Sequence, residues 1–266
     1  MAKAKGARGN AEPAKKIGRS SLPPPTRRDV LSVGVLGATG RMGEAVQRLT
    51  KGSAHLALGP LVGEGDTLDA LGTADVVIDF STPRATESLA KLAAKKRLPL
   101  VIGTTGLDAA AESALKAAAK KSPVFVSSNM SIGVFVLGRL IQKAEQLLGS
   151  SFDVELVEVH HRKKVDAPSG TAILLAETLK SSRELVHGRK GRPGARASTE
   201  LGMHAVRGGD VIGDHTVHFL GDGERLELTH RATHRDLFAH GALRVAAVIA
   251  GLAPGRYAMG DIIDRL

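Results

Sequence analysis

Short apolar runs alternate with helix-forming segments near the start of the chain, and this pattern constrains the fold more than any other feature. The apolar runs lie at residues 30–37, 56–62, 75–80, 98–103 and 123–128. Alanine-rich stretches such as residues 85–96 and 107–121 lie between them. Continuous apolar runs are typical of strands buried on both faces, and intervening helices connect parallel neighbours. The pattern therefore predicts an α/β fold with a doubly wound parallel sheet.

The sequence after residue 129 has a different texture. Its predicted elements are a helix at 131–149, a strand at 152–161, a helix at 169–182 and a final helix at 236–252. A basic, glycine-rich loop is expected at residues 186–198, after the helix at 169–182. Between this loop and the final helix, polar and apolar residues alternate, and glycines mark the turns. That alternation is typical of antiparallel strands. We therefore predict a smaller α+β domain over residues 130–235, after a first domain at residues 30–129.

The excess of positive charge is concentrated in residues 1–29. This segment holds eight Lys and Arg residues and two acids, a net charge of +6 out of +10 for the whole chain. It also has too few apolar residues to offset the entropy cost of ordering. We predict a disordered basic tail. A transit peptide, an anion-binding arm and a plain solvated extension are all compatible with its composition.

Residue types that are scarce exclude several classes of function. Without cysteine the chain has no disulfides, thiolate zinc sites, iron–sulfur clusters or cysteine nucleophiles, and it suits a reducing compartment. Aromatic residues make up 3% of the chain, too few for the stacking platforms that bind single-stranded nucleic acid. No segment approaches the ~20 apolar residues of a membrane span, and none resembles a secretory signal. We expect a cytoplasmic protein with neither nucleic acid nor a membrane as partner.

Three glycines follow the first apolar run at the spacing G-x-x-G-x-x-G. The motif consists of Gly37, Ala38, Thr39, Gly40, Arg41, Met42 and Gly43. Such glycines allow a tight turn and let the backbone approach a pyrophosphate at the positive end of a helix. The motif predicts a Rossmann-type dinucleotide site, although glycine-rich turns also occur for packing alone. Glu64, with Asp66 behind it, is the nearest acid for the ribose, and Arg41 could reach a 2′-phosphate, so NADH or NADPH would fit.

Small and hydroxyl-bearing residues follow three later apolar runs. They are Asp79, Phe80, Ser81 and Thr82, then Gly103, Thr104 and Thr105, and finally Ser127, Ser128, Asn129 and Met130. In open α/β sheets, ligands gather beyond the carboxyl ends of the strands. We expect these residues to line the same crevice, with 127–130 closing the nicotinamide pocket. Ordinary strand-to-helix turns are the alternative.

The stretch from Glu158 to Thr171 is the densest concentration of chemically active residues. It reads EVHHRKKVDAPSGT and holds two histidines, three cations and the start of a predicted helix. Histidine can donate a proton near neutral pH, cations suit a carboxylate, and free N–H groups at a helix start bind anions. Ser169 is also a natural N-cap and Pro168 a normal helix start, so part of the stretch has a structural explanation. The combination predicts a site for an anionic substrate.

This stretch resembles the signature of the 4-hydroxy-tetrahydrodipicolinate reductase family, also called dihydrodipicolinate reductase, of lysine and diaminopimelate biosynthesis. The resemblance continues in order through GATGRMG, VIDFSTP, VIGTTG, SSNMSIGV, AVRGGDVIGDHTV and FAHGA. It implies reduction by NADH or NADPH of a cyclic, dicarboxylated imine, with loss of its 4-hydroxyl group as water. It also implies a Rossmann-type domain completed by residues 236–266, a substrate-binding and oligomerisation domain, and a homotetramer.

The resemblance assigns roles to individual residues. His160 falls at the position of the proton donor, and Lys164 falls at that of the second catalytic group. His161, Gly170 and Thr171 fall at substrate-binding positions. Cofactor-binding positions are residues 37–42, 103–105 and 127–130. Lys163 is a departure, because some relatives have a third histidine there.

The remaining histidine pairs have a plainer interpretation. His215 and His218, and likewise His230 and His234, have spacings that occur at metal sites. Predicted strands and turns would not bring either pair to one face, and neither has a clear carboxylate partner. We therefore expect structural or solvent-facing histidines and no metal.

Three other features limit the choice of function. Residues 207–210, Arg-Gly-Gly-Asp, indicate a hairpin turn, with a substrate role as the alternative. Arg235 is a candidate for a second substrate carboxylate or an interdomain contact. Tyr257 is followed four positions later by Asp261, which excludes the Tyr-x-x-x-Lys dyad of short-chain dehydrogenases. A nonenzymatic NAD(P)-binding sensor, a related imine reductase and a nucleic-acid binder with a basic tail are the alternatives to the reductase.

Overall fold

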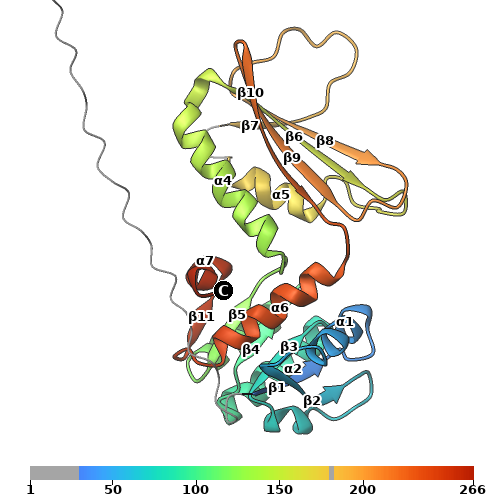
Figure 1. Cartoon of the computed structure of the whole chain (residues 1–266), viewed down its shortest axis with the longest axis vertical. Coiled ribbons are helices and arrows are strands. Elements are labelled where there is room, and N and C mark those ends of the chain that lie inside the picture. Colours follow the sequence, from blue (N-terminus) through green and yellow to red (C-terminus); the bar gives the residue numbers. More distant parts are fainter. Residues whose placement is uncertain (1–29, 180–182) are drawn as a thin grey trace, which may run out of the picture.

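The computed structural model describes residues 30–179 and 183–266, and the disordered tail predicted for residues 1–29 lies outside this part of the chain. Two sheets, each with its own helices, follow one another along the long axis of the molecule (Figure 1). The chain enters the second half at α4 (Ile132–Leu148) and returns to the first at α6 (Asp236–Ile249).

The first sheet contains six parallel strands in the order β11-β5-β4-β3-β1-β2. They are β1 (Leu31–Leu36), β2 (Leu56–Val62), β3 (Val76–Asp79), β4 (Leu100–Ile102), β5 (Pro123–Val126) and β11 (Gly255–Tyr257). β1 pairs with β2 on one side and with β3 on the other, so the strand order reverses at β1. The doubly wound, Rossmann-type sheet predicted from the apolar runs is confirmed.

Helices cover both faces of this sheet. They are α1 (Arg41–Thr50), α2 (Pro83–Lys96), α3 (Ala109–Ala119), α6 and α7 (Met259–Ile262). Successive residues of a strand point to opposite faces, and β3 shows the consequence. Val76 and Ile78 belong to the core cluster that contains residues of α1 and α6, whereas Val77 belongs to the cluster under α2 and α3. The return of α6 and β11 therefore adds a helix layer and an edge strand to the first sheet.

The second sheet has five strands in the order β10-β9-β6-β8-β7. Its elements, with α4, are β6 (Asp153–His160), α5 (Gly170–Glu177), β7 (Glu184–His187), β8 (Glu200–Arg207), β9 (Asp214–Gly221) and β10 (Glu224–Arg231). The antiparallel pairing predicted from the alternation holds for β9 with β10 and with β6. It is wrong for β8, which runs parallel to both β6 and β7. The second half is thus an α+β unit with a mixed sheet.

The hairpin turn predicted at residues 207–210 is also wrong. β8 and β9 lie on opposite sides of β6 and do not pair with each other, so the chain between them crosses the end of β6. Arg207 is the last residue of β8 and lies in register with His160. Paired glycines mark a turn in a crossover as well as in a hairpin, and only contacts distant in sequence decide between the two.

Short elements account for the other differences. β7 and β11 were not predicted, because each is a short strand that depends on a neighbour for its pairing and lies at the edge of its sheet. α5 ends at Glu177, before the predicted end at residue 182. Short 3₁₀ helices are η1 (Leu68–Thr73), η2 (Gly149–Ser151) and η3 (Ile263–Arg265). Among the described residues, no helix is both long and apolar enough to cross a membrane.

Candidate functional site

The glycine motif forms the turn between β1 and α1. Gly37 has a φ of 79°, and a Cβ there would lie 2.4 Å from the Phe80 carbonyl oxygen. A Cβ on Gly43 would lie 2.2 Å from the Gly37 carbonyl oxygen, so helix and strand pack through this glycine. A Cβ on Gly40 would contact only that same oxygen, at 3.3 Å. The turn itself therefore requires Gly37 and Gly43, whereas Gly40 keeps the backbone accessible to a ligand.

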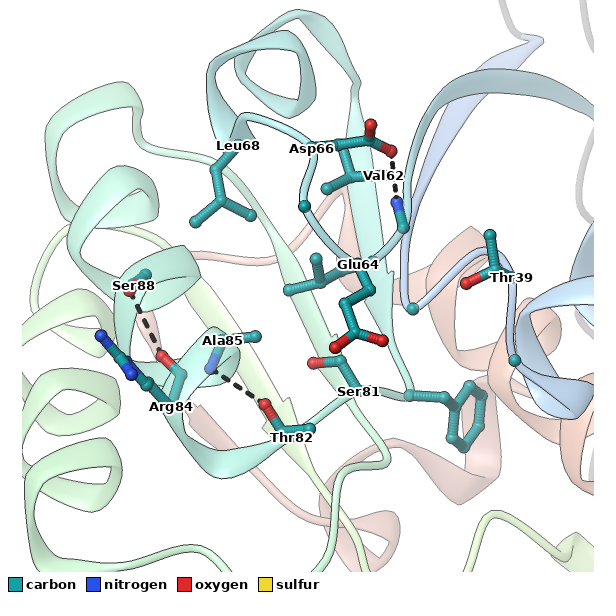
Figure 2. Close-up of a pocket in the computed structure, with 16 residues that line it drawn as sticks. Thr39, Val62, Glu64, Asp66, Leu68, Ser81, Thr82, Arg84, Ala85 and Ser88 are labelled. Atoms are coloured by element: carbon teal, nitrogen blue, oxygen red, sulfur yellow. Dashed lines mark hydrogen bonds between the residues drawn. The ribbon is translucent and has the colours of Figure 1, made fainter.

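A pocket of about 510 Å³ lies beside this turn (Figure 2). Its lining includes Gly37, Thr39 and Gly40 from the turn, Glu64 and Asp66 after β2, and Thr82, Arg84 and Ser88 from the start of α2. α1 begins at the pocket without a side-chain cap, so its first N–H groups can receive an anion. Figure 2 shows the Glu64 side chain projecting into the space between Thr39 and Thr82. The fold therefore brings the predicted ribose acid to the glycine motif, as a dinucleotide requires.

A buried carboxylate holds two of the predicted cofactor loops together. Asp79 ends β3 and is fully buried, and it accepts a hydrogen bond from the Ser81 N–H at 3.0 Å. The hydroxyls of Ser81, Thr86 and Thr104 donate to the same carboxylate at 2.5, 2.5 and 3.0 Å. Burial raises the pKa of Asp79 in spite of these hydrogen bonds. The Thr104 hydroxyl thus makes its hydrogen bond within the protein, to Asp79. Gly103 lies against the Phe80 ring, where a Cβ would clash.

A second pocket, of about 450 Å³, lies where the two halves of the molecule meet. The predicted residues in its lining are Thr105, Ser128, Asn129, His160, His161, Lys164, Gly170 and Thr171. All five residues expected to act in catalysis or substrate binding therefore lie together, beside three expected to bind the cofactor. The described residues that line this pocket include histidines, a lysine and Arg235 but no carboxylate, which suits an anionic ligand.

Two contacts join the halves at this pocket. Asn129, after β5, donates from Nδ2 to the Thr171 hydroxyl at 3.0 Å. Arg235, at the start of α6, lies with Nη2 3.1 Å from His161 Nε2. The Asn129 side chain is itself oriented, because its Oδ1 accepts the Ser131 N–H at 2.8 Å. Arg235 thus connects the start of α6 to His161 in the second half, and its two expected roles stay predictions.

Glu158, the first residue of the predicted stretch, lies directly behind His160, although the sequence assigned no role to it. Its side chain is fully buried, and Oε2 lies 2.5 Å from His160 Nδ1. Arg207 donates to both carboxylate oxygens at 2.8 Å, and the Ser169 N–H donates to Oε1 at 3.0 Å. Burial by itself raises the pKa of Glu158, but these hydrogen bonds outweigh it and hold the pKa below its usual value. Residues two apart in a strand point to the same face of the sheet, so the spacing of Glu158 and His160 was the sequence signal that could have revealed this contact.

The start of α5 is anchored below the pocket. The Ser169 Oγ accepts the Ala172 N–H at 3.1 Å as an N-cap and lies 3.1 Å from His215 Nε2. His215 is 3% exposed, and its ring packs edge-on against His160 with centroids 5.2 Å apart. Burial, and then the charge of His160, lower the pKa of His215 to about 4. His215 is therefore neutral at pH 7 and packs against His160 without carrying charge.

Lys164 lies at the rim of the pocket. Its Nζ contacts both oxygens of Asp166 at 2.8 Å, and this contact lowers the pKa of Asp166. Arg207, at the end of β8, donates from Nη2 to the Asp166 carbonyl oxygen at 2.6 Å and so holds the loop that contains Lys164 and Asp166. The Lys164 ammonium therefore has a weak, half-exposed partner that a buried anion could displace.

Some residues predicted for the cofactor face neither pocket. Met130 and Ala38 are 1% and 6% exposed and belong to the core cluster under α1 and α6, against which Met42 also packs. Arg41 is exposed at the start of α1 and outside the lining of both pockets. The Ser127 hydroxyl donates to the Asn129 carbonyl oxygen at 2.6 Å. These residues therefore lie outside the linings of both pockets, and the structure does not bring their side chains to the predicted cofactor site.

Both histidine pairs have a carboxylate neighbour, which the sequence did not indicate, and the His234 side chain is mostly exposed. His218 lies 3.5 Å from Glu227, and His234 lies 3.2 Å from Asp236. Within residues 30–179 and 183–266, no three histidine, aspartate or glutamate side chains gather as a metal site.

Known proteins resemble the chain over most of its length. Family models described as the N-terminus and the C-terminus of dihydrodipicolinate reductase match residues 31–130 and 133–263. A 4-hydroxy-tetrahydrodipicolinate reductase of Akkermansia muciniphila is 45% identical, with 88% of this chain and 98% of that protein covered. The enzyme of the same name from Myxococcus xanthus is 46% identical, with 86% and 96% covered.

A solved structure supports the fold independently. Dipicolinate-bound dihydrodipicolinate reductase from Paenisporosarcina sp. TG-14 superposes with a TM-score of 0.71 at 23% identity, with 88% of this chain and 99% of that chain covered. Because both family models match and the curated relatives cover most of its length, this chain belongs to the dihydrodipicolinate reductase family.

Proposed function

We propose that this chain reduces 4-hydroxy-tetrahydrodipicolinate in lysine and diaminopimelate biosynthesis. The reaction consumes the substrate, NAD(P)H and one proton, and it yields tetrahydrodipicolinate, NAD(P)⁺ and water. The observation that carries the proposal is the cationic pocket in which His160, Lys164 and the start of α5 meet the end of β5. Family membership supports the choice of substrate.

A coupled assay tests the proposal. The upstream synthase generates the unstable substrate in place from aspartate semialdehyde and pyruvate, and the absorbance of NADH or NADPH is followed. We expect oxidation only when all components are present. Cofactor binding without oxidation would favour a nonenzymatic sensor, and oxidation only with a different cyclic imine would favour a related reductase.

The residues of the pocket have separate tasks in this proposal. A bound reduced nicotinamide supplies the hydride. His160 supplies from Nε2 the proton that balances the hydride, because its Nδ1 is already bound to Glu158. Lys164 is the second catalytic group, and its ammonium can leave Asp166 to neutralise charge on the substrate. Most of the acceleration would come from positioning and charge stabilisation.

The two carboxylates of the substrate require two anion sites. The free N–H groups of Gly170 and Thr171 at the start of α5, together with Lys164, form the first. His161 and Arg235, which lie 3.1 Å apart across the halves, form the second. A dicarboxylate would thus bridge the two halves of the molecule at the point where the cofactor loops end.

Gly170→Ala is expected to weaken substrate binding without harming the fold. A Cβ on Gly170 would contact no other residue, and Gly170 is the first residue of α5, where alanine is a better helix former. The added methyl group would occupy the pocket, and we expect the KM for the substrate to rise roughly tenfold or more. Steady-state kinetics and thermal melts measure both effects. Gly251→Ala, whose Cβ would lie 3.9 Å from its nearest neighbour, is the control; an unchanged KM in Gly170→Ala would contradict this placement of the substrate.

We further propose that NADH is preferred over NADPH. Glu64 and Asp66 are the charged residues nearest the ribose position, and a carboxylate accepts hydrogen bonds from ribose hydroxyls but repels a 2′-phosphate. Figure 2 shows the Arg84 guanidinium directed away from Glu64. The Asp66 carboxylate accepts the Gly63 N–H at 2.8 Å, which leaves Glu64 as the acid available to the ribose.

Glu64→Gln tests this preference. Loss of the carboxylate removes both the charge-assisted hydrogen bond to NADH and the repulsion of NADPH, so the ratio of their kcat/KM values should fall about tenfold. Asp69→Asn removes an exposed acid outside the pocket and is the matched control. If Glu64→Gln leaves this ratio unchanged, residues other than Glu64 determine the preference for NADH.

We also propose that the chain forms a homotetramer through its second sheet. α4 and α5 cover one face of that sheet (Figure 1). The opposite face carries Val157, Val159 and Val206 from neighbouring strands, and Val206 is 46% exposed. Apolar residues on an open sheet face are typical of a subunit interface. Sedimentation equilibrium should give four times the 27.7 kDa of one chain, and a monomer would contradict the proposal.

A further inference from the structure

A buried ion pair lies directly behind the proposed proton donor. Glu158 precedes His160 by two residues on β6, and both side chains are buried on the same face. β8 runs parallel to β6, so that Arg207 lies beside His160 in register and reaches the Glu158 carboxylate. A buried ion pair contributes little net stability compared with apolar side chains of similar volume. Its position against a histidine of the pocket therefore points to a task beyond stability.

The hydrogen bonds of this pair determine which nitrogen of His160 carries a proton. Each Glu158 oxygen receives two donors: Arg207 and the Ser169 N–H on Oε1, and Arg207 and His160 Nδ1 on Oε2. The low pKa of Glu158 keeps the carboxylate ionised, and an ionised carboxylate can only accept hydrogen bonds. His160 Nδ1 must therefore be the donor. The Nε2 atom remains for a ligand in the pocket.

The surroundings of the ring hold it in this orientation. His215 packs edge-on against it, and the backbone of Gly213 passes so close that a Cβ there would lie 2.9 Å from Nε2. Glu158 and His215 thus contact the imidazole, and the Gly213 backbone leaves no room for a side chain beside it. The ring cannot turn to exchange its nitrogens without breaking the bond to Glu158.

We infer that Glu158 and Arg207 are positioning residues that keep the Nδ1 proton on His160, so that Nε2 alone delivers a proton to the substrate. The inference rests on the proposed reduction. In that step the N–H bond at Nε2 breaks, the proton forms a new bond to the substrate, and the hydride provides the electron pair for the reduced bond. His160 is left neutral with its proton on Nδ1, hydrogen-bonded to Glu158. Arg207 keeps that carboxylate from taking the proton.

Glu158→Gln reverses the critical hydrogen bond. The amide group donates to His160 Nδ1, so the ring carries its proton on Nε2 and loses the partner that stabilises its cation. We expect kcat to fall about 100-fold or more, by analogy with the loss that follows when a serine-protease aspartate becomes asparagine. KM for NADH should stay near its original value, and the solvent deuterium effect on kcat should increase because proton transfer limits the rate. A purely structural role would leave the solvent effect unchanged.

The chain offers a matched control on the other face of the same strand. Glu155 also accepts from an arginine and a histidine, Arg196 at 2.9 Å and His204 at 2.7 Å. Glu155→Gln should leave kcat unchanged. If Glu158→Gln fails to fold because Arg207 is left unpaired, the double variant Glu158→Gln with Arg207→Met removes both charges. It should fold and keep the low kcat, and wild-type kcat in either variant would overturn the inference.

Nitrogen NMR of histidine-labelled protein separates this inference from the proposed reaction. The His160 signals are assigned by their loss in His160→Gln. We expect the neutral ring to be protonated on Nδ1 in the native chain and on Nε2 in Glu158→Gln. An inactive native enzyme in the coupled assay would refute the reduction and leave this result standing, whereas an Nε2-protonated ring in the native chain would refute the positioning role.

Discussion

His160→Gln is expected to lower kcat by about 10²–10⁴, the range that a general acid contributes, while NADH binds as before. Glutamine keeps a side chain of similar reach but has no proton to give at neutral pH. His160 lines the pocket at the end of β6 and does not line the pocket beside the glycine turn, so the cofactor should be unaffected. Turnover is measured in the coupled assay and NADH binding by fluorescence titration.

His240→Gln is the control for this experiment. His240 is exposed on α6, so its replacement changes one histidine without touching the pocket. Normal turnover in His160→Gln, with the same fold and the same cofactor affinity, would remove His160 from the role of proton donor. His161 and Lys164 would then be the remaining candidates among the residues in the pocket.

Gly43→Ala is expected to abolish cofactor binding and to destabilise the first sheet. The new Cβ would lie 2.2 Å from the Gly37 carbonyl oxygen and 2.8 Å from the Ala38 Cα, both backbone atoms that cannot rotate away. α1 must therefore move away from β1, and the glycine turn must open. We expect a loss of about 1–3 kcal/mol in the free energy of unfolding, the usual cost of overpacking a buried site. Thermal melts and NADH titration measure the two effects.

Gly52→Ala provides the comparison. It also replaces a glycine beside α1, but its Cβ would meet the Leu49 carbonyl oxygen at 3.6 Å, an ordinary contact. Its stability and NADH affinity should stay close to those of the native chain. If Gly43→Ala behaved in the same way, the turn would be able to adapt, and the third glycine would have no packing role.

The sequence predicts those parts of the fold that depend on local pattern. Continuous apolar runs predict the parallel strands, and residues at successive strand ends meet because parallel strands end at the same edge of a sheet. This reasoning brought Glu64 to the glycine turn. The family resemblance placed His160 and Lys164 beside Gly170, and the pocket contains all three. Their chemical roles stay predictions.

Long-range pairing is what the sequence does not reveal. Arg207 precedes two glycines, a pattern that is typical of a turn. In the structure, β8 pairs in parallel with β6, and this pairing brings Arg207 to Glu158. Nothing local distinguishes that crossover from a hairpin. Asp79 was grouped with its neighbours at a strand end, but its burial under three hydroxyls depends on Thr104 from the next strand and on Thr86 from α2. Such residues become recognisable only when the sheet register is known.

Mass spectrometry of the product formed with NADH that carries deuterium at both C4 positions of the nicotinamide tests the central claim most directly. The substrate is generated in place by the synthase, and the product is analysed before and after addition of this chain. Reduction by the proposed route places one carbon-bound deuterium in each molecule of tetrahydrodipicolinate. Product without deuterium, or NADH oxidation that does not depend on the synthase, would contradict hydride transfer to this substrate.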